Sequence, residues 1–97
     1  MKILNPWSGA TIADVATDDA RSVAAKYRAA RAAQPRWAAM PIRKRIETIA
    51  RFRERIVALE ETLARTLTHE VGKPIRQSRN ELKGLLASKW YPFELGK

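Results

Sequence analysis

The sequence has no cysteine, one histidine and only four glycines among 97 residues. The absence of cysteine excludes disulfides, thiolate metal sites and a cysteine nucleophile. A single histidine excludes zinc sites that need several imidazoles from one chain. Aromatic residues make up 7% of the chain, and no apolar run approaches the roughly 18 residues of a membrane span. The length allows one domain, and it excludes a dinucleotide-binding domain with a separate substrate domain.

Positive charge and alanine are what the chain has in excess. Lys and Arg number 19 against 10 Asp and Glu, which gives a net charge of +9. Apolar residues make up 45%, but sixteen residues are alanine, so the core is expected to be thin and the chain helical. Met1-Lys2-Ile3-Leu4 is followed directly by Asn5-Pro6, so no apolar signal segment is present. Without cysteine or a signal segment, the expected location is cytoplasmic.

The first 17 residues predict a short β-hairpin, or a single strand and a turn. Proline presets φ, and serine and glycine suit tight positions, so Asn5-Pro6-Trp7-Ser8-Gly9 is typical of a turn. Residues 11–15 alternate weakly and include β-branched side chains. An isolated hairpin is marginally stable in water, so we expect it to lie on another part of the molecule.

A first helix is predicted over residues 18–33. Thr17 can cap its free N–H groups, and two aspartates occupy its first turn. We expect the helix to end near residue 33, because Pro35 disfavours a helical conformation in the residue before it. Residues 34–41 then form a connector in which Trp37 is predicted to be a buried anchor. The inner stripe of the helix is only weakly hydrophobic and consists of Val23, Tyr27, Ala30 and Gln34.

Two further helices are predicted over residues 42–56 and 58–70. A continuous helix to residue 70 without a cap would be unusually long, so a break is expected near 57–60. The pairs Glu47–Arg51 and Glu61–Arg65 have favourable spacing on the exposed side. The apolar stripe, interrupted by Arg53, is wider than one partner helix needs. Its members are Ile42, Ile46, Ile49, Ala50, Phe52, Ile56, Val57, Leu59, Leu63 and Leu67.

Gly72-Lys73-Pro74 is a strong helix stop, because glycine can adopt the left-handed conformation and proline follows it. A last helix is predicted over residues 75–89, ended by Trp90-Tyr91-Pro92. It is expected to bury Ile75, Leu82, Leu85 and Leu86. The predicted fold class is therefore mainly α, with about four helices and a short N-terminal hairpin.

No constellation of residues predicts a catalytic, cofactor-binding or metal site. The glycines stand singly, so neither G-x-G-x-x-G nor the P-loop pattern is present. His69-Glu70 could open an H-E-x-x-H motif, but residue 73 is lysine. His69 is better explained as a helix C-terminal residue near the last carbonyls. Glu60 and Glu61 point about 100° apart on a helix and fit a solvated face.

The basic residues raise the alternative of a nucleic-acid interface. Residues 42–55 hold six positive and two negative charges, and Arg43, Lys44, Arg51 and Arg55 share the polar face. A helix, the Gly-Lys-Pro turn and a second helix also fit the outline of a helix-turn-helix. However, the arginines are scattered and mixed with acids, and aromatics do not interleave with them. A solvated basic face explains them better, and a basic helical nucleic-acid binder stays a minor alternative.

Several motifs, taken in order, resemble the N-terminal region of the aldehyde dehydrogenase superfamily. Asn5-Pro6-Trp7-Ser8-Gly9 is similar to that family's N-P-x-[ST]-G, and Glu70-Val71-Gly72-Lys73-Pro74 is similar to its E-x-G-K-P. Between them lie an Ala/Arg-rich helix, Trp37, Pro41 and an Arg/Ile/Leu helix, in the family's order. Gln77-Ser78-Arg79-Asn80-Glu81 resembles the acidic residue that enters the next helix. The resemblance covers about residues 3–88.

The resemblance implies an α/β enzyme that oxidises an aldehyde to a carboxylic acid with NAD(P). In that family a cysteine attacks the aldehyde, a hydride passes to the nicotinamide, and a glutamate assists hydrolysis of the thioester. None of these positions matches a residue here, so the chain carries no catalytic or cofactor-binding residue from the family. Residues 1–97 are expected to be a single incomplete domain, a truncated fragment that neither binds NAD nor oxidises aldehydes alone.

The residues after Ser88 depart from the family pattern, because Pro92 breaks the expected helix. A premature stop or a shifted reading frame would explain this end. Without the rest of the fold, the wide apolar stripe on residues 42–67 would be exposed, and exposed apolar patches drive association. We therefore expect a homo-oligomer through these apolar helix faces, and docking to full-length relatives as a second option. A helical protein–protein interaction module is the alternative function, and no membrane partner is expected.

Overall fold

The computed structural model describes residues 1–87, and its elements follow in the order β1, β2, α1, α2, α3, α4. Strand β1 (Lys2–Leu4) pairs antiparallel with β2 (Thr11–Asp14), which confirms the predicted hairpin. The register shifts between Ile3 and Leu4. The N-terminal ammonium closes the open end of the hairpin, where it donates to the Asp14 carboxylate at 3.1 Å.

Helix α1 (Ala20–Ala39) is capped by Asp19 and not by Thr17. The Asp19 carboxylate accepts a hydrogen bond from the Ser22 N–H at 2.8 Å, and the Ser22 hydroxyl accepts one from the Asp19 N–H at 2.9 Å. This reciprocal capping box satisfies two N–H groups at once. A lone threonine satisfies only one, which explains why the helix begins later than predicted.

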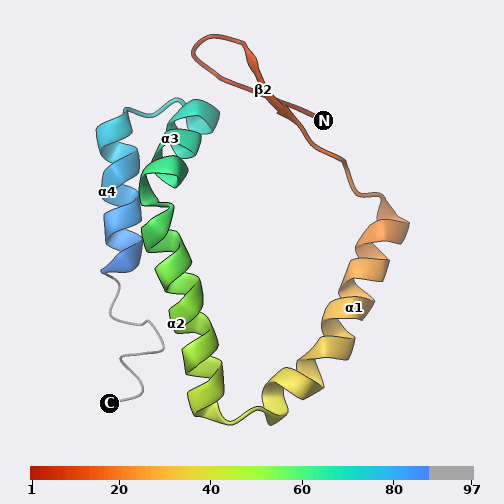
Figure 1. The fold of residues 1–97 in the computed structure, drawn as a ribbon. Coiled ribbons are helices and arrows are strands. Elements are labelled where there is room, and N and C mark those ends of the chain that lie inside the picture. Colours follow the sequence, from red (N-terminus) through yellow and green to blue (C-terminus); the bar gives the residue numbers. More distant parts are fainter. Residues whose placement is uncertain (88–97) are drawn as a thin grey trace.

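The predicted end of this helix near residue 33 is wrong, because α1 continues through Pro35 to Ala39. A proline inside a helix removes one hydrogen bond and displaces the carbonyl of the preceding turn, and α1 bends near its C-terminal end (Figure 1). Only about one turn follows Pro35, so the helix tolerates the loss. Trp37 therefore lies on α1 and not in a connector, and at 38% exposure it is not the buried anchor that we predicted.

Helices α2 (Ile42–Ala58) and α3 (Glu60–Val71) confirm the predicted break near residues 57–60. Leu59 separates them, and its N–H reaches the carbonyls of Arg55 and Ile56 at 3.1 Å each. Helix α3 ends at Gly72, whose φ of 81° is the left-handed conformation expected from the sequence.

Helix α4 (Ile75–Leu86) returns alongside α3 (Figure 1). Its predicted continuation to residue 89, and the predicted stop at Trp90-Tyr91-Pro92, reach outside the described residues. Leu82 is buried as predicted, whereas Leu85 is 41% exposed. The fully formed core lies where α3 meets α4, and its buried residues are Ala64, Ser78 and Leu82.

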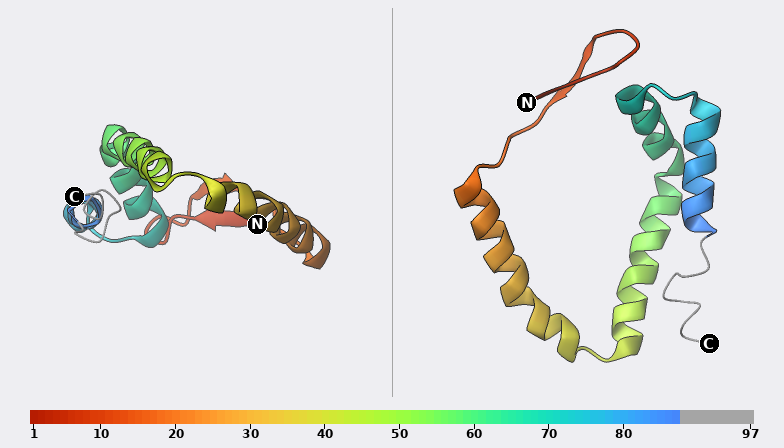
Figure 2. Two further views of the ribbon diagram at one scale, coloured as in Figure 1. Left: turned by 90° about the horizontal axis from the view of Figure 1, so that it is seen from below. Right: turned by 180° about the vertical axis from the view of Figure 1, so that it is seen from behind.

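The helices form a flat, open frame instead of a compact body. The radius of gyration is 17.5 Å, whereas a compact domain of this length has about 12.5 Å. The frame measures 48 × 38 × 18 Å and is thin when seen from below (Figure 2). Helix α1 forms one side, α2, α3 and α4 form the opposite side, and the hairpin lies across one end (Figure 1). No residue of α1 is buried.

Candidate functional site

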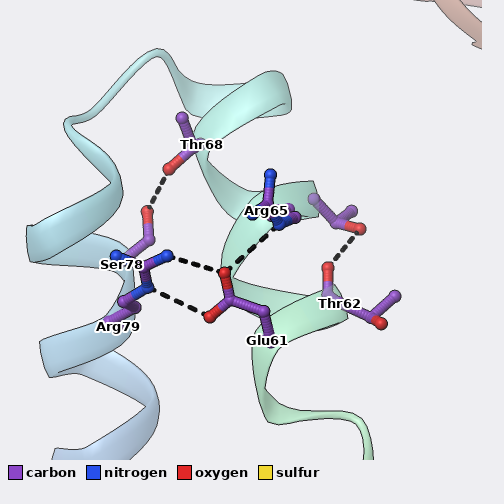
Figure 3. A network of polar contacts seen from close by, with 7 residues as sticks. Glu61, Thr62, Arg65, Thr68, Ser78 and Arg79 are labelled. Atoms are coloured by element: carbon purple, nitrogen blue, oxygen red, sulfur yellow. Dashed lines mark hydrogen bonds and ion pairs between the residues drawn. The ribbon is translucent and has the colours of Figure 1, made fainter.

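An ion-pair cluster joins α3 to α4. The Glu61 carboxylate accepts hydrogen bonds from Arg79, at 3.0 Å from Nε and 2.7 Å from Nη2 (Figure 3). Arg65 lies 3.2 Å from the same carboxylate, which confirms the predicted Glu61–Arg65 pair. Hydrogen bonding and charge from Arg79, aided by Arg65, lower the pKa of Glu61, and Glu61 in turn raises the pKa of Arg79. Glu61 is exposed, but the solvated-face interpretation missed its bond to α4.

Further polar contacts hold α4 in place. The hydroxyls of Thr68 and Ser78 lie 2.8 Å apart (Figure 3), and Ser78 is fully buried. Lys73 pairs with Glu81. From α2, the Arg53 guanidinium donates to the carbonyl of Leu86 at 3.1 Å. This hydrogen bond explains why a charged residue interrupts the apolar stripe of α2: Arg53 joins α2 to the end of α4.

The predicted Glu47–Arg51 pair is replaced by other contacts on α2. Lys44 donates to Glu47 at 3.1 Å, and Arg51 donates to the Thr48 hydroxyl at 3.3 Å. Lys44 and Arg51 thus make local contacts on an exposed helix face. Nothing in their arrangement supports a nucleic-acid interface.

The turn Gly72-Lys73-Pro74 meets the loop of the hairpin. A Cβ added at Gly72 would lie only 2.8 Å from Cγ of Pro6. Residue 72 therefore requires glycine for two reasons, its positive φ and the close approach of Pro6. We call this contact between Pro6 and Gly72 the corner. It brings together two of the segments, N-P-x-[ST]-G and E-x-G-K-P, that carry the family resemblance.

Hydrogen bonds to Asn5 hold the loop of the hairpin, and a tryptophan in this loop is exposed. The Asn5 side-chain oxygen accepts from the N–H groups of Trp7 and Ser8, at 2.9 and 3.3 Å. The Gly9 N–H donates to the Asn5 carbonyl at 2.8 Å. Trp7 projects from this loop and is 93% exposed.

Large apolar side chains of α1, α2 and the link between them lie uncovered. Their exposed fractions run from 38% to 64%. Val23 and Tyr27 of the predicted stripe of α1 are among them, because no other element packs extensively on α1 within residues 1–87. We call this set the open apolar surface: Val23, Tyr27, Trp37, Met40, Ile42, Phe52 and Val57.

The described part of the chain offers no cluster for a metal ion or a dinucleotide. No group of three or more metal-ligating side chains occurs among residues 1–87. His69 lies in the last turn of α3, where the sequence placed it. Gly9, Gly72 and Gly84 lie in a loop, in a turn and inside α4, so they do not form a phosphate-binding loop. The residues present therefore do not fit an NAD(P) site.

Comparison of the full sequence with known proteins finds the same family that the motifs suggested. The model of the aldehyde dehydrogenase family matches residues 1–94, and the chain belongs to this family. It is 37% identical over 83 residues to N-succinylglutamate 5-semialdehyde dehydrogenase 1 of Caulobacter vibrioides. It is 37% identical over 78 residues to N-succinylglutamate 5-semialdehyde dehydrogenase of Chromobacterium violaceum, and 40% identical over 63 residues to that of Sphingopyxis alaskensis.

These matches cover most of this chain and little of the relatives. They span 86%, 80% and 65% of the chain, but only 18%, 16% and 13% of the respective relatives. No solved structure matches the chain significantly. Within residues 1–87, none of the helices has both the length and the hydropathy needed to cross a membrane.

Proposed function

We propose that this chain is a structural segment of an aldehyde-oxidising dehydrogenase and supplies none of its catalytic groups. The open apolar surface is the observation that carries this proposal. Removal of apolar surface from water is the main favourable term in folding, and α1 buries none of its residues. Helix α1 therefore needs a cover that residues 1–87 do not provide. Membership of the family supports the remainder of a dehydrogenase as that cover.

The relatives suggest the reaction of the completed enzyme. They are named for N-succinylglutamate 5-semialdehyde, and we propose that the completed enzyme oxidises this aldehyde to its acid with NAD(P). The chain contains no cysteine, so a cysteine nucleophile for this reaction would come from residues outside it. The cytosol keeps thiols reduced, as a cysteine nucleophile requires, which supports a cytoplasmic location.

A chimaeric enzyme tests this proposal. In the Caulobacter vibrioides relative, the segment that matches this chain over 83 residues would be replaced by the corresponding residues of this chain. We expect the chimaera to fold and to oxidise N-succinylglutamate 5-semialdehyde within about tenfold of the parent, a loss equivalent to about 1.4 kcal/mol. The measurement is the rate of NAD(P)H formation.

Two controls keep the test specific. The 97-residue chain alone should show no aldehyde oxidation and no saturable NAD binding in calorimetry. Binding of NAD by the isolated chain would contradict the non-catalytic role, and a folded but inactive chimaera would contradict the structural role. The homo-oligomer through apolar helix faces stays a prediction, checked by sedimentation equilibrium of the free chain.

A further inference from the structure

The side of α2 that meets α4 continues as an apolar row beyond the end of α4. The Arg53 guanidinium donates to the carbonyl of Leu86, the last residue of α4, at 3.1 Å, so this side of α2 faces α4. Helical spacing places Ile42, Ile46 and Ile49 within about 40° of Arg53 around the helix axis. We call these three residues the isoleucine row. Figure 1 shows that α2 runs on past the end of α4 toward Ile42, so the row lies where α4 has ended.

The isoleucine row lacks a full cover within residues 1–87. Ile42 is 59% exposed, and Ile46 and Ile49 are only partly buried. Among the described elements, only α3 makes more than marginal contact with α2, and α3 follows Leu59 at the other end of that helix. Removal of apolar side chains from water favours folding and association. The row is therefore a surface on which an apolar segment would be stabilised.

The residues that follow α4 have the composition and the length to cover this row. Four large apolar side chains occur within residues 90–95, namely Trp90, Tyr91, Phe93 and Leu95. The row extends about 16 Å from Arg53, because each helical residue rises about 1.5 Å. Residues 88–95 can span about 26 Å when extended. A segment that starts beside Arg53 can therefore reach Ile42.

We propose that the segment from Trp90 to Leu95 docks on the isoleucine row of α2. A segment on a short linker has an effective concentration of about 1 mM near its site, so it is favoured over a second copy of the chain at micromolar concentration. Helix α1 forms the opposite side of the frame (Figure 1) and does not supply the cover. Docking of this segment on α2 is independent of the proposed function, which concerns the cover of α1.

Engineered disulfides test where the segment docks, since the chain has no cysteine of its own. In the 97-residue chain, Ile46→Cys is combined with Phe93→Cys, and the matched control combines Lys44→Cys with Phe93→Cys. Lys44 lies about 160° from Ile46 around α2. Cysteines form a disulfide only when their Cα atoms approach within about 7 Å, so we expect the Ile46 pair to oxidise about tenfold faster than the control pair.

The measurement is the loss of free thiol with time at micromolar protein concentration. A second set of variants, with Trp90→Cys in place of Phe93→Cys, allows for a shift in the register of the segment along α2. A faster reaction of the Ile46 pair in either set supports docking on the isoleucine row. Equal rates for the Ile46 and Lys44 pairs in both sets would overturn the inference.

Tryptophan fluorescence gives a readout that does not depend on register. Trp7→Phe with Trp37→Phe leaves Trp90 as the only tryptophan, and Trp37→Phe with Trp90→Phe leaves Trp7, which is 93% exposed, as the control. An indole removed from water emits at a shorter wavelength. We therefore expect the emission of Trp90 to shift to longer wavelength in urea and that of Trp7 to stay unchanged. Trp90 emission that is the same with and without urea would overturn the inference.

Other occupants of the row give distinct results. A second copy of the chain would give disulfides between chains, seen as dimers on a non-reducing gel. A cover that only the remainder of the dehydrogenase supplies would leave the Ile46 pair as slow as the Lys44 pair in the free chain. Either result overturns docking of the segment on α2, while the proposed function stands.

Discussion

The α3–α4 pair and helix α1 differ in what holds them in place. Helix α3 and helix α4 share buried Ala64, Ser78 and Leu82, and Glu61 bonds across them to Arg79. Helix α1 is longer and well capped, yet it buries nothing. Local sequence signals are thus enough to form a helix. Within residues 1–87, α3 and α4 pack against each other, whereas no element packs extensively on α1.

This difference assigns each region a role. The α3–α4 pair, with the corner at Gly72, is a small self-contained unit. Helix α1, by contrast, has no buried residue of its own. The variants below are designed to break the first unit while sparing the second, in order of decreasing expected effect.

Replacing the core leucine should have the largest effect. Leu82→Ala removes buried methyl groups between α3 and α4, where Leu82 is 8% exposed, and we expect a loss of about 2–4 kcal/mol in the free energy of unfolding. Val23→Ala on α1 is the matched control, because Val23 is 54% exposed and should cost about 0.5 kcal/mol or less. Urea unfolding followed by circular dichroism measures both. Similar losses for the two variants would show that α1 is as well packed as α4.

Disrupting the corner, the contact between Pro6 and Gly72, should have the second largest effect on stability. Gly72→Ala introduces a Cβ 2.8 Å from Cγ of Pro6 at a φ of 81°, and we expect a cost of about 2–3 kcal/mol. Gly9→Ala is matched, because its φ is 72° but nothing lies within 4 Å of the new Cβ; it should cost only about 1 kcal/mol. Pro6→Ala should recover part of the excess at Gly72 and none at Gly9. The same stability measurement applies, and equal costs at the two glycines would rule out the corner contact.

The ion pair should give the smallest effect, visible through pH. The pKa of Glu61 is lowered in the folded state by Arg79. Its stabilisation is therefore present above the ordinary glutamate pKa and is lost as pH falls below about 4. Glu61→Gln should flatten this acid loss in pH-dependent urea unfolding, whereas Glu47→Gln, which removes a pair within α2, should keep it.

Two aspartates at the start of α1 also make the stability of the protein sensitive to acid. The pKa of Asp18 is lowered by its bond to Lys26, and the pKa of Asp19 is lowered by the Ser22 N–H. Both contribute acid sensitivity of the same sign in each variant. If Glu61→Gln leaves the pH profile unchanged, the acid sensitivity belongs to the cap of α1 and not to the α3–α4 pair.

Much of this fold follows from local signals in the sequence. The hairpin turn, the break at Leu59 and the left-handed Gly72 each depend on one or two residues and their neighbours, and each was predictable. The start of α1 was missed because the Asp19–Ser22 capping box competes with the simpler threonine cap. Its end was missed because a proline one turn from a helix end disturbs few hydrogen bonds.

The tertiary contacts were harder to predict from the sequence. Nothing in the spacing of Pro6 and Gly72 indicates that they touch, although the two motifs that contain them carry the family resemblance. The bond from Glu61 to Arg79 was equally hidden, because exposed charges at long separation have many alternative partners. Trp37 was predicted to be buried from its residue type and from the family resemblance, but it is 38% exposed and residues 1–87 supply no surface that covers it.

Amide hydrogen exchange of α1 in two contexts is the most direct measurement of the central claim. In the free chain, the amides of α1 should exchange much faster than those of α3 and α4, because few tertiary contacts protect them. In the chimaeric dehydrogenase, α1 should become as protected as the α3–α4 pair. Strong protection of α1 in the free chain, or none in the folded chimaera, would contradict a helix that is covered by the rest of the enzyme.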